Sequence, residues 1–67
     1  MKQVYVIVLN TCNGCAEFYD LILDVFCQNR RDAFEFKTLD IAEMVVDKLR
    51  KEDAFKKDYI TIRTEYV

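Results

Sequence analysis

Two cysteines three positions apart carry the clearest chemistry in this chain, in the motif Cys12-Asn13-Gly14-Cys15. The motif directly follows an apolar run and precedes an amphipathic segment that is predicted to be a helix. On the first turn of a helix, sulfurs at this spacing can close a disulfide with little backbone movement, and the unpaired N–H groups and the helix dipole stabilise a thiolate. We therefore predict a redox-active dithiol, with Cys12 at the mouth of the turn as the nucleophile and Cys15, one turn deeper, as the resolving thiol.

Neighbouring residues are assigned supporting roles in this site. Thr11 is the predicted N-cap of the helix, and Thr11, Asn13 and Gly14 are candidate substrate-binding residues. Gly14 would either let a substrate backbone approach or ease a tight turn. The alternative is that two small cysteines only fill space at the start of a helix. Cys27, about 18 Å further along the same predicted helix, is expected to be core filler that forms no disulfide with Cys15.

Composition excludes several classes of function. The 67 residues contain no histidine, which removes the Ser/His/Asp and Cys/His mechanisms and every His-ligated metal site. The formal charge of −2 gives no reason to expect nucleic acid as a partner, and no apolar run is long enough to cross a membrane. An odd count of three cysteines without a signal peptide predicts a reducing, cytoplasmic setting.

Hydrophobic patterning predicts five elements in a single domain spanning residues 1–67. The expected elements are a strand at 4–9, a helix at 12–29, a strand at 34–39, a helix at about 41–52 and a strand at 59–67. The first strand is uniformly apolar and is expected to be buried on both faces. Asp40 is the expected N-cap of the second helix, with Glu43 completing a capping box. The order βαβαβ predicts an α/β fold with two helices and a three-stranded mixed sheet whose first two strands are parallel.

Taken together, these features resemble the thioredoxin superfamily and, within it, the glutaredoxin-like branch, in a minimal thioredoxin-like βαβαβ form. The resemblance follows the pattern along most of the chain, and its one specific motif is C-x-x-C. It implies a small oxidoreductase in which Cys12 attacks and Cys15 resolves, with protein or glutathione disulfides as substrates. Glutathione would serve as the reductant, and no cofactor would be required.

The family's Thr-Val-Pro segment corresponds best to Thr61, Ile62 and Arg63. The resemblance therefore implies that Ile62 and Arg63 lie at the substrate-binding site. The family's cis-proline is missing, as are its C-terminal strand and helix. A cis bond before Arg63 would cost about 2.5–4 kcal/mol, so a trans bond is expected.

Arg63 has two interpretations. A guanidinium near Cys12 would lower the pKa of that thiol and could hold a glutathione carboxylate. The alternative is a surface charge on an edge strand, paired with Glu65 or another carboxylate. The sequence slightly favours this second interpretation.

Two other classes of function remain open. Cys12 and Cys15 could bind metal instead, as a zinc site shared by two chains, a Cu(I) site, or an iron–sulfur cluster bridging two chains. The chain could also be a non-catalytic interaction module. Exposed strand edges and a helix that is apolar on most sides further predict a homodimer, formed through a sheet edge or a helix face.

Overall fold

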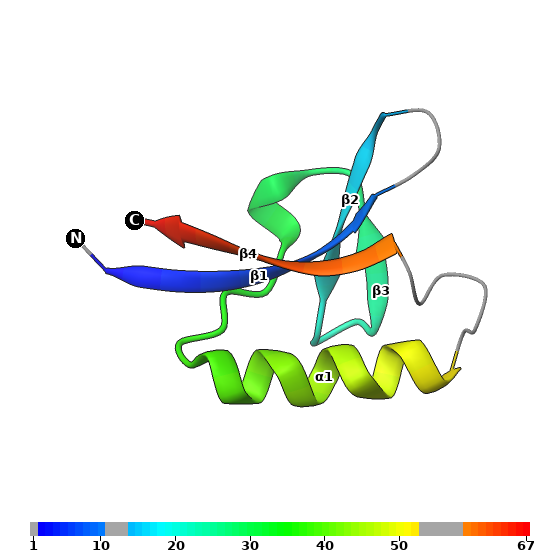
Figure 1. Cartoon of the computed structure of the whole chain (residues 1–67). Coiled ribbons are helices and arrows are strands. Elements are labelled where there is room, and N and C mark those ends of the chain that lie inside the picture. Colours follow the sequence, from blue (N-terminus) through cyan, green and yellow to red (C-terminus); the bar gives the residue numbers. More distant parts are fainter. Residues whose placement is uncertain (1, 11–13, 53–58) are drawn as a thin grey trace.

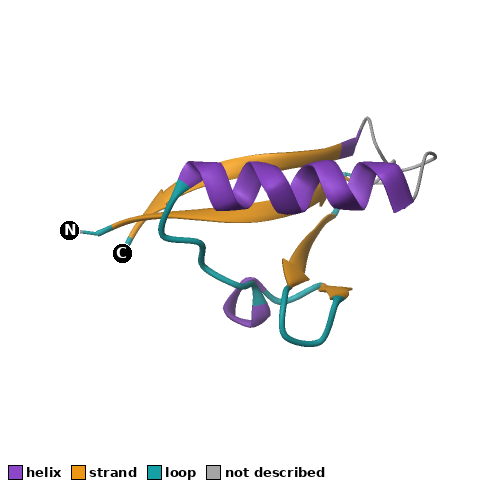
Figure 2. Ribbon diagram, turned by 90° about the horizontal axis from the view of Figure 1, so that it is seen from below, coloured by secondary structure: helices purple, strands orange, loops and turns teal. Residues whose placement is uncertain are grey.

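The computed structural model describes residues 2–10, 14–52 and 59–67. Their element order is β1 (Gln3–Asn10), β2 (Ala16–Asp20), β3 (Val25–Cys27), the 3-10 helix η1 (Arg30–Asp32), α1 (Leu39–Glu52) and β4 (Ile60–Tyr66). The strands form one antiparallel sheet in the order β3-β2-β1-β4 (Figure 1). Helix α1 lies along one face of this sheet, over β1 and β4 (Figure 2).

The predicted α/β fold, with its thioredoxin-like βαβαβ order, three-stranded mixed sheet and two helices, is therefore wrong. The helix predicted at 12–29 is absent from its described part, residues 14–29, which contains the strands β2 and β3 and the turn between them. The expected strand at 34–39 is reduced to a single antiparallel bridge between Phe36 and Tyr5, and α1 already begins at Leu39. All the strand pairs in the sheet are antiparallel, so the expected parallel pair is absent from the described residues.

Turn chemistry explains why residues 16–27 fold as a hairpin. The Asp20 carboxylate accepts hydrogen bonds from the N–H groups of Ile22 and Leu23, at 3.0 and 3.4 Å. Asp24 adopts the left-handed conformation, with φ of 56°, and its carboxylate accepts a hydrogen bond from the Tyr19 hydroxyl. Aspartate favours both arrangements because its short side chain can bond nearby backbone groups and tolerates positive φ. The two aspartates thus end β2 and start β3, instead of lining the solvent face of a helix.

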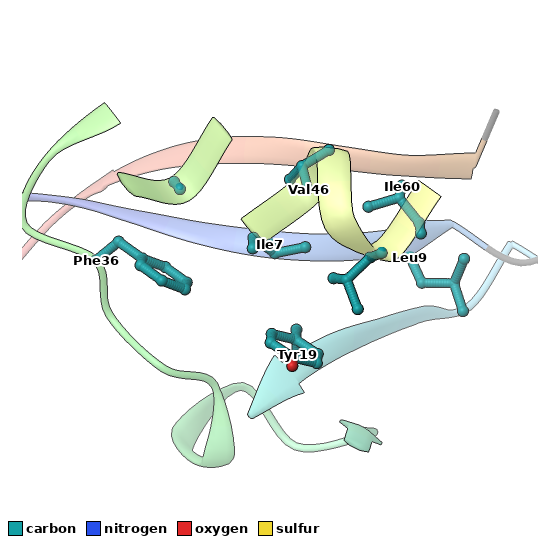
Figure 3. Packing of buried hydrophobic residues seen from close by; sticks show 8 residues of the cluster. Ile7, Leu9, Tyr19, Phe36, Val46 and Ile60 are labelled. Atoms are coloured by element: carbon teal, nitrogen blue, oxygen red, sulfur yellow. The ribbon is translucent and has the colours of Figure 1, made fainter. Parts of the chain in front are cut away.

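The larger part of the core lies between the sheet and α1 (Figure 3). Its buried members come from β1, β2, β4, α1 and the segment before α1: Ile7, Leu9, Tyr19, Phe36, Ala42, Val46, Leu49 and Ile60. The prediction that β1 is buried on both faces is confirmed, because its residues from Val4 to Leu9 are all buried or half-buried.

The helix predicted at about 41–52 is confirmed as α1, but it begins two residues earlier. Asp40 consequently lies in its first turn and is not its cap. Ala42, Val46 and Leu49 are its buried positions, whereas the apolar Ile41 and Met44 are exposed.

A smaller cluster lies on the opposite face of the sheet. Val6, Val8, Phe18 and Ala33 are its buried members. Charged side chains from η1 and β4 cover this face. Arg30 bonds Glu65 at 2.6 Å and Glu35 at 3.0 Å, which ties η1 to β4 across 35 positions of sequence.

Strand β4 agrees with the strand predicted at 59–67. It pairs with β1 so that Arg63 lies opposite Val6, Glu65 opposite Val4 and Ile62 opposite Ile7. Isoleucines 60 and 62 face α1, where Ile60 is buried in the larger part of the core and Ile62 packs against it. The described residues contain no cis peptide bond, in agreement with the trans bond expected before Arg63.

The half-buried Arg30–Glu65 pair should contribute more to stability than an exposed ion pair does. We expect Arg30→Gln to lower the free energy of unfolding by about 1 kcal/mol at neutral pH. The hydrogen bond from Arg30 is the main cause that holds the pKa of Glu65 below its usual value. This contribution is therefore present above the carboxyl pKa of the unfolded chain and is lost as pH falls through the lower pKa of the folded state.

Urea unfolding of Arg30→Gln at pH 7 and at pH 3 measures this effect. Lys48→Gln is the matched control, because Lys48 and Glu52 are exposed and 3.9 Å apart. The control should change the free energy of unfolding by less than about 0.5 kcal/mol. Equal effects of the two variants at neutral pH would contradict the prediction.

The buried Tyr19 hydroxyl should make the fold sensitive to alkaline pH. Burial, followed by the hydrogen bond to the Asp24 carboxylate, raises the pKa of Tyr19 from 10.0 to about 12. The stabilisation is complete below pH 10, where the unfolded chain also holds the proton, and it is lost as pH rises through about 12. Tyr19→Phe should abolish this component and cost about 1 kcal/mol at neutral pH.

Unfolding curves between pH 8 and pH 12, compared for the wild type and Tyr19→Phe, isolate this component. Tyr59→Phe, at an exposed tyrosine, is the control and should follow the wild type. Parallel pH curves for the wild type and Tyr19→Phe would show that Tyr19 does not cause the alkaline loss.

Candidate functional site

The C-x-x-C motif lies in the connection between β1 and β2. The last paired residues of that hairpin are Asn10 and Ala16. Gly14 and Cys15 are described, and both are exposed. Thr11, Cys12 and Asn13 lie outside the described residues. The expectation that the motif opens a helix is wrong, and the helix dipole gives no reason for a stabilised thiolate here.

Gly14 is required by the backbone of this connection. Its φ is +77°, in the left-handed region that other residues adopt only with strain. A Cβ at this position would meet no atom within 4 Å, so space does not demand a glycine. Of the two predicted reasons for Gly14, the structure supports easing a tight turn.

The pairing of Cys12 with Cys15 stays a prediction, because Cys12 lies outside the described residues. Cys15 is exposed and lies just before β2, not one turn into a helix as expected. The burial argument that assigned the resolving role to Cys15 therefore no longer holds.

The described neighbours of this connection come from the start of β4. Leu9 pairs with Ile60, and the Asn10 side-chain amide donates a hydrogen bond to the Thr61 hydroxyl at 3.3 Å. Sequence reasoning missed this contact, because it depends on the register between two strands that are 51 positions apart. The contact between Asn10 and Thr61 could be predicted only from the register of β1 with β4.

Ile62 and Arg63 lie further from the connection than the resemblance implied. They pair with Ile7 and Val6, about 10 and 13 Å before Asn10 along β1 at 3.3 Å per residue. Ile62 is half-buried on the side of α1. Their role in substrate binding stays a prediction.

The charge of Arg63 is already engaged on β4. Its guanidinium bonds the Glu65 carboxylate at 2.7 and 2.8 Å and lies 5.1 Å from the centre of the Phe18 ring. This is the edge-strand ion pair of the second interpretation. Arg63 covers the smaller part of the core, and Glu65 holds it there.

Cys27 lies in β3 opposite Phe18 and is half-buried, not on the apolar side of a helix as expected. Phe18, opposite Cys27, lies three residues after Cys15, and neighbouring strands are about 4.8 Å apart. The Cα atoms of Cys15 and Cys27 are therefore about 11 Å apart, which excludes a direct disulfide between them. Burial raises the pKa of the Cys27 thiol and makes it less reactive. The carboxylates that add to this rise are those of Asp32, Asp20 and Glu17.

The part of the chain that the structure describes contains neither a cluster of metal ligands nor a membrane-spanning helix. No group of three or more His, Cys, Asp or Glu side chains there could hold a metal ion. A zinc site with four protein ligands would therefore have to draw on Cys12 or on a second chain. Within residues 2–10, 14–52 and 59–67, no helix is long and apolar enough to cross a membrane.

The described surface also exposes an apolar turn between β2 and β3. Leu21, Ile22 and Leu23 are 38%, 82% and 67% exposed. Beside this turn, a groove of about 260 Å³ runs between Phe34 and Ile41. The helix that was predicted to be apolar on most sides is in fact this exposed turn and its flanking strands.

The engagement of Arg63 with Glu65 predicts that Arg63→Ala leaves the reactivity of Cys12 and Cys15 unchanged. The variant should instead lower the free energy of unfolding by about 1 kcal/mol, because Phe18 loses its cover. Alkylation rates across pH, with peptide mapping, measure the first effect, and urea unfolding measures the second. Arg31→Ala, at an exposed arginine, is the control. A thiol pKa that rises only in Arg63→Ala would show that Arg63 acts on the cysteines.

Comparison of the chain with protein-family models, curated proteins and solved structures gave no match. The resemblance to the thioredoxin superfamily therefore stays a prediction that depends on the C-x-x-C motif, and the fold that it implied is not the fold of this chain.

Proposed function

We propose that the chain is a small thiol–disulfide oxidoreductase whose Cys12 and Cys15 interconvert between a dithiol and a disulfide. One observation carries the proposal: both cysteines belong to a short hairpin connection whose described end, Gly14-Cys15, is exposed. A substrate disulfide can approach an exposed connection without any rearrangement of the sheet. Because the paired strands already bring the ends of the connection together, closing a disulfide within it costs little further chain entropy.

In the proposed cycle, the Cys12 thiolate attacks one sulfur of a protein or glutathione disulfide. The substrate S–S bond breaks, a mixed disulfide forms, and the departing sulfur leaves as a thiolate that takes a proton. The Cys15 thiolate then attacks the Cys12 sulfur and releases the second substrate thiol. Two electrons pass to the substrate, and two glutathione molecules restore the dithiol as they become glutathione disulfide.

Metal binding is the second candidate function, and the position of the motif favours it. A C-x-x-C pair in a tight connection has the ligand spacing of zinc ribbons. Two copies sharing Cys12 and Cys15 would supply four thiolates for zinc or for an iron–sulfur cluster, whereas one copy would supply two for Cu(I).

Redox equilibration in graded glutathione buffers separates these functions. After rapid alkylation, peptide mass mapping gives the oxidised fraction of Cys12, Cys15 and Cys27. We expect Cys12 and Cys15 to convert together at a potential in the window of about −120 to −270 mV. Cys27 serves as the internal control and should remain reduced.

Serine variants then test the division of roles. With Cys12 as the nucleophile, Cys15→Ser should accumulate a mixed disulfide with glutathione on Cys12, because no resolving thiol remains. Cys12→Ser should accumulate much less. The opposite pattern would reverse the two roles.

Two outcomes would overturn the oxidoreductase proposal. A pair that alkylates only after a chelator is added, with metal detected in the anaerobically purified protein, would establish the metal site instead. A metal-free pair that stays reduced in the most oxidising buffer would leave a non-catalytic interaction module.

A further inference from the structure

The outer edge of β4 pairs with no other strand of residues 2–10, 14–52 and 59–67. The strand order β3-β2-β1-β4 places β4 at an end, where β1 is the one described strand that pairs with it. Helix α1 lies over the face of the sheet and does not extend over this edge (Figure 2). The edge is therefore accessible to another strand.

The hydrogen-bond pattern shows which backbone groups point outward. Lys2 and Val67 exchange both backbone bonds, each at 2.8 Å. In an antiparallel pair such exchanges recur at every second residue, so Ile62, Thr64 and Tyr66 turn their N–H and C=O groups away from β1. Tyr5, which lies opposite Thr64, confirms this alternation, because its own backbone groups bond Phe36 on the other side.

A side chain of α1 occupies a backbone group at one end of this edge. The Arg50 guanidinium donates a hydrogen bond to the Ile60 carbonyl at 2.9 Å. Beyond Ile60, Ile62, Thr64 and Tyr66 offer three N–H and three C=O groups that have no backbone partner among the described residues. The strand sequence Ile-Thr-Ile-Arg-Thr-Glu-Tyr contains no lysine or proline, the residues with which proteins commonly protect an edge.

The charges on β4 decide which register a second copy of the strand can adopt. In an antiparallel pair about a twofold axis, an axis at Arg63 or at Glu65 would place each of these charges opposite its own copy. An axis at Thr64 places Arg63 opposite Glu65 of the second copy, and Glu65 opposite its Arg63. Opposite charges in such cross-strand positions are favourable, and like charges are not. An axis at Ile62 would oppose the open Thr64 to Ile60, whose carbonyl is already bonded by Arg50.

The Thr64 register also satisfies the backbone and covers apolar surface. Thr64 lies opposite its own copy and Ile62 opposite Tyr66, so all three outward-facing residues can exchange both bonds with the second strand. On the face that carries α1, the half-buried Ile62 meets a Tyr66 that is 65% exposed in the single chain. On the other face, two arginines and two glutamates alternate around the axis.

We propose that the outer edge of β4 is the interface of a homodimer, in which two copies of β4 pair antiparallel about a twofold axis at Thr64. The two four-stranded sheets then form one continuous sheet. The proposal is independent of the cysteine chemistry, because the interface contains no cysteine.

Mass in solution, measured by light scattering with a reductant and a chelator present, tests the interface. These additives prevent both disulfide and metal bridges between copies. At high micromolar concentration we expect twice the 8.0 kDa of one chain. Thr64→Pro should raise the dissociation constant of the dimer about tenfold or more, because it removes two intermolecular hydrogen bonds.

Proline at position 64 should leave the fold of one chain intact, because that N–H does not bond β1. Circular dichroism checks the fold of the variant. Thr64→Ala is the matched control, since it shortens the side chain but keeps the N–H, and it should remain dimeric.

Charge variants test the register separately. Arg63→Glu and Glu65→Arg each place like charges opposite one another, so each should be monomeric alone. An equimolar mixture should form a 1:1 heterodimer, because the opposing charges then differ in sign at every position. This recovery also shows that both variants are folded.

Three results would overturn the proposal. One is a mass of a single chain at high micromolar concentration. Another is a dimer that is insensitive to Thr64→Pro, which would place the interface elsewhere, for example at the exposed turn of Leu21–Leu23. The third is a failure of the two charge variants to associate when each is folded by circular dichroism.

Discussion

Burial of β1 on both faces is the constraint on which the rest of the structure depends. Its alternate side chains face α1 on one side and the cluster around Phe18 on the other, so neither face can be left to solvent. Strands β2 and β4 satisfy its two edges, and Phe36 adds the bridge to Tyr5. Strands β2 and β4 and helix α1 are therefore held in place by the side of β1 that each covers, whereas β3 and η1 pack on β2.

This arrangement also determines where the cysteine chemistry can occur. Because β2 returns antiparallel beside β1, the C-x-x-C motif falls in the connection at one end of the sheet. Its described end, Gly14-Cys15, is exposed, as disulfide exchange needs, but it begins no helix whose terminus could stabilise a thiolate. The chemistry proposed for this chain is therefore that of two thiols in a strand connection, without the electrostatic support that the thioredoxin resemblance implied.

The two faces of the sheet use different physical means to exclude water. Helix α1 covers one face with apolar side chains, whereas η1 and β4 cover the other with Arg30, Arg63 and Glu65. The same Arg63 and Glu65 that shield Phe18 also give β4 a self-complementary charge pattern. The two residues that cover the core at Phe18 are thus also the two that would pair with a second copy in the proposed dimer.

The sequence by itself determined β1, α1 and β4, because each has one clear hydrophobic period and a length that suits it. It also determined the C-x-x-C pair and the trans bond before Arg63. It could not determine the segment of β2 and β3, because Asp20 and Asp24, four positions apart, fit both the polar stripe of a helix and the ends of a tight turn. Only the tertiary structure decided between them: pairing with β1 buries Phe18 and Tyr19 on opposite faces of the sheet. That long-range pairing, which local periodicity does not encode, placed the cysteines in a hairpin and Arg63 beside Glu65.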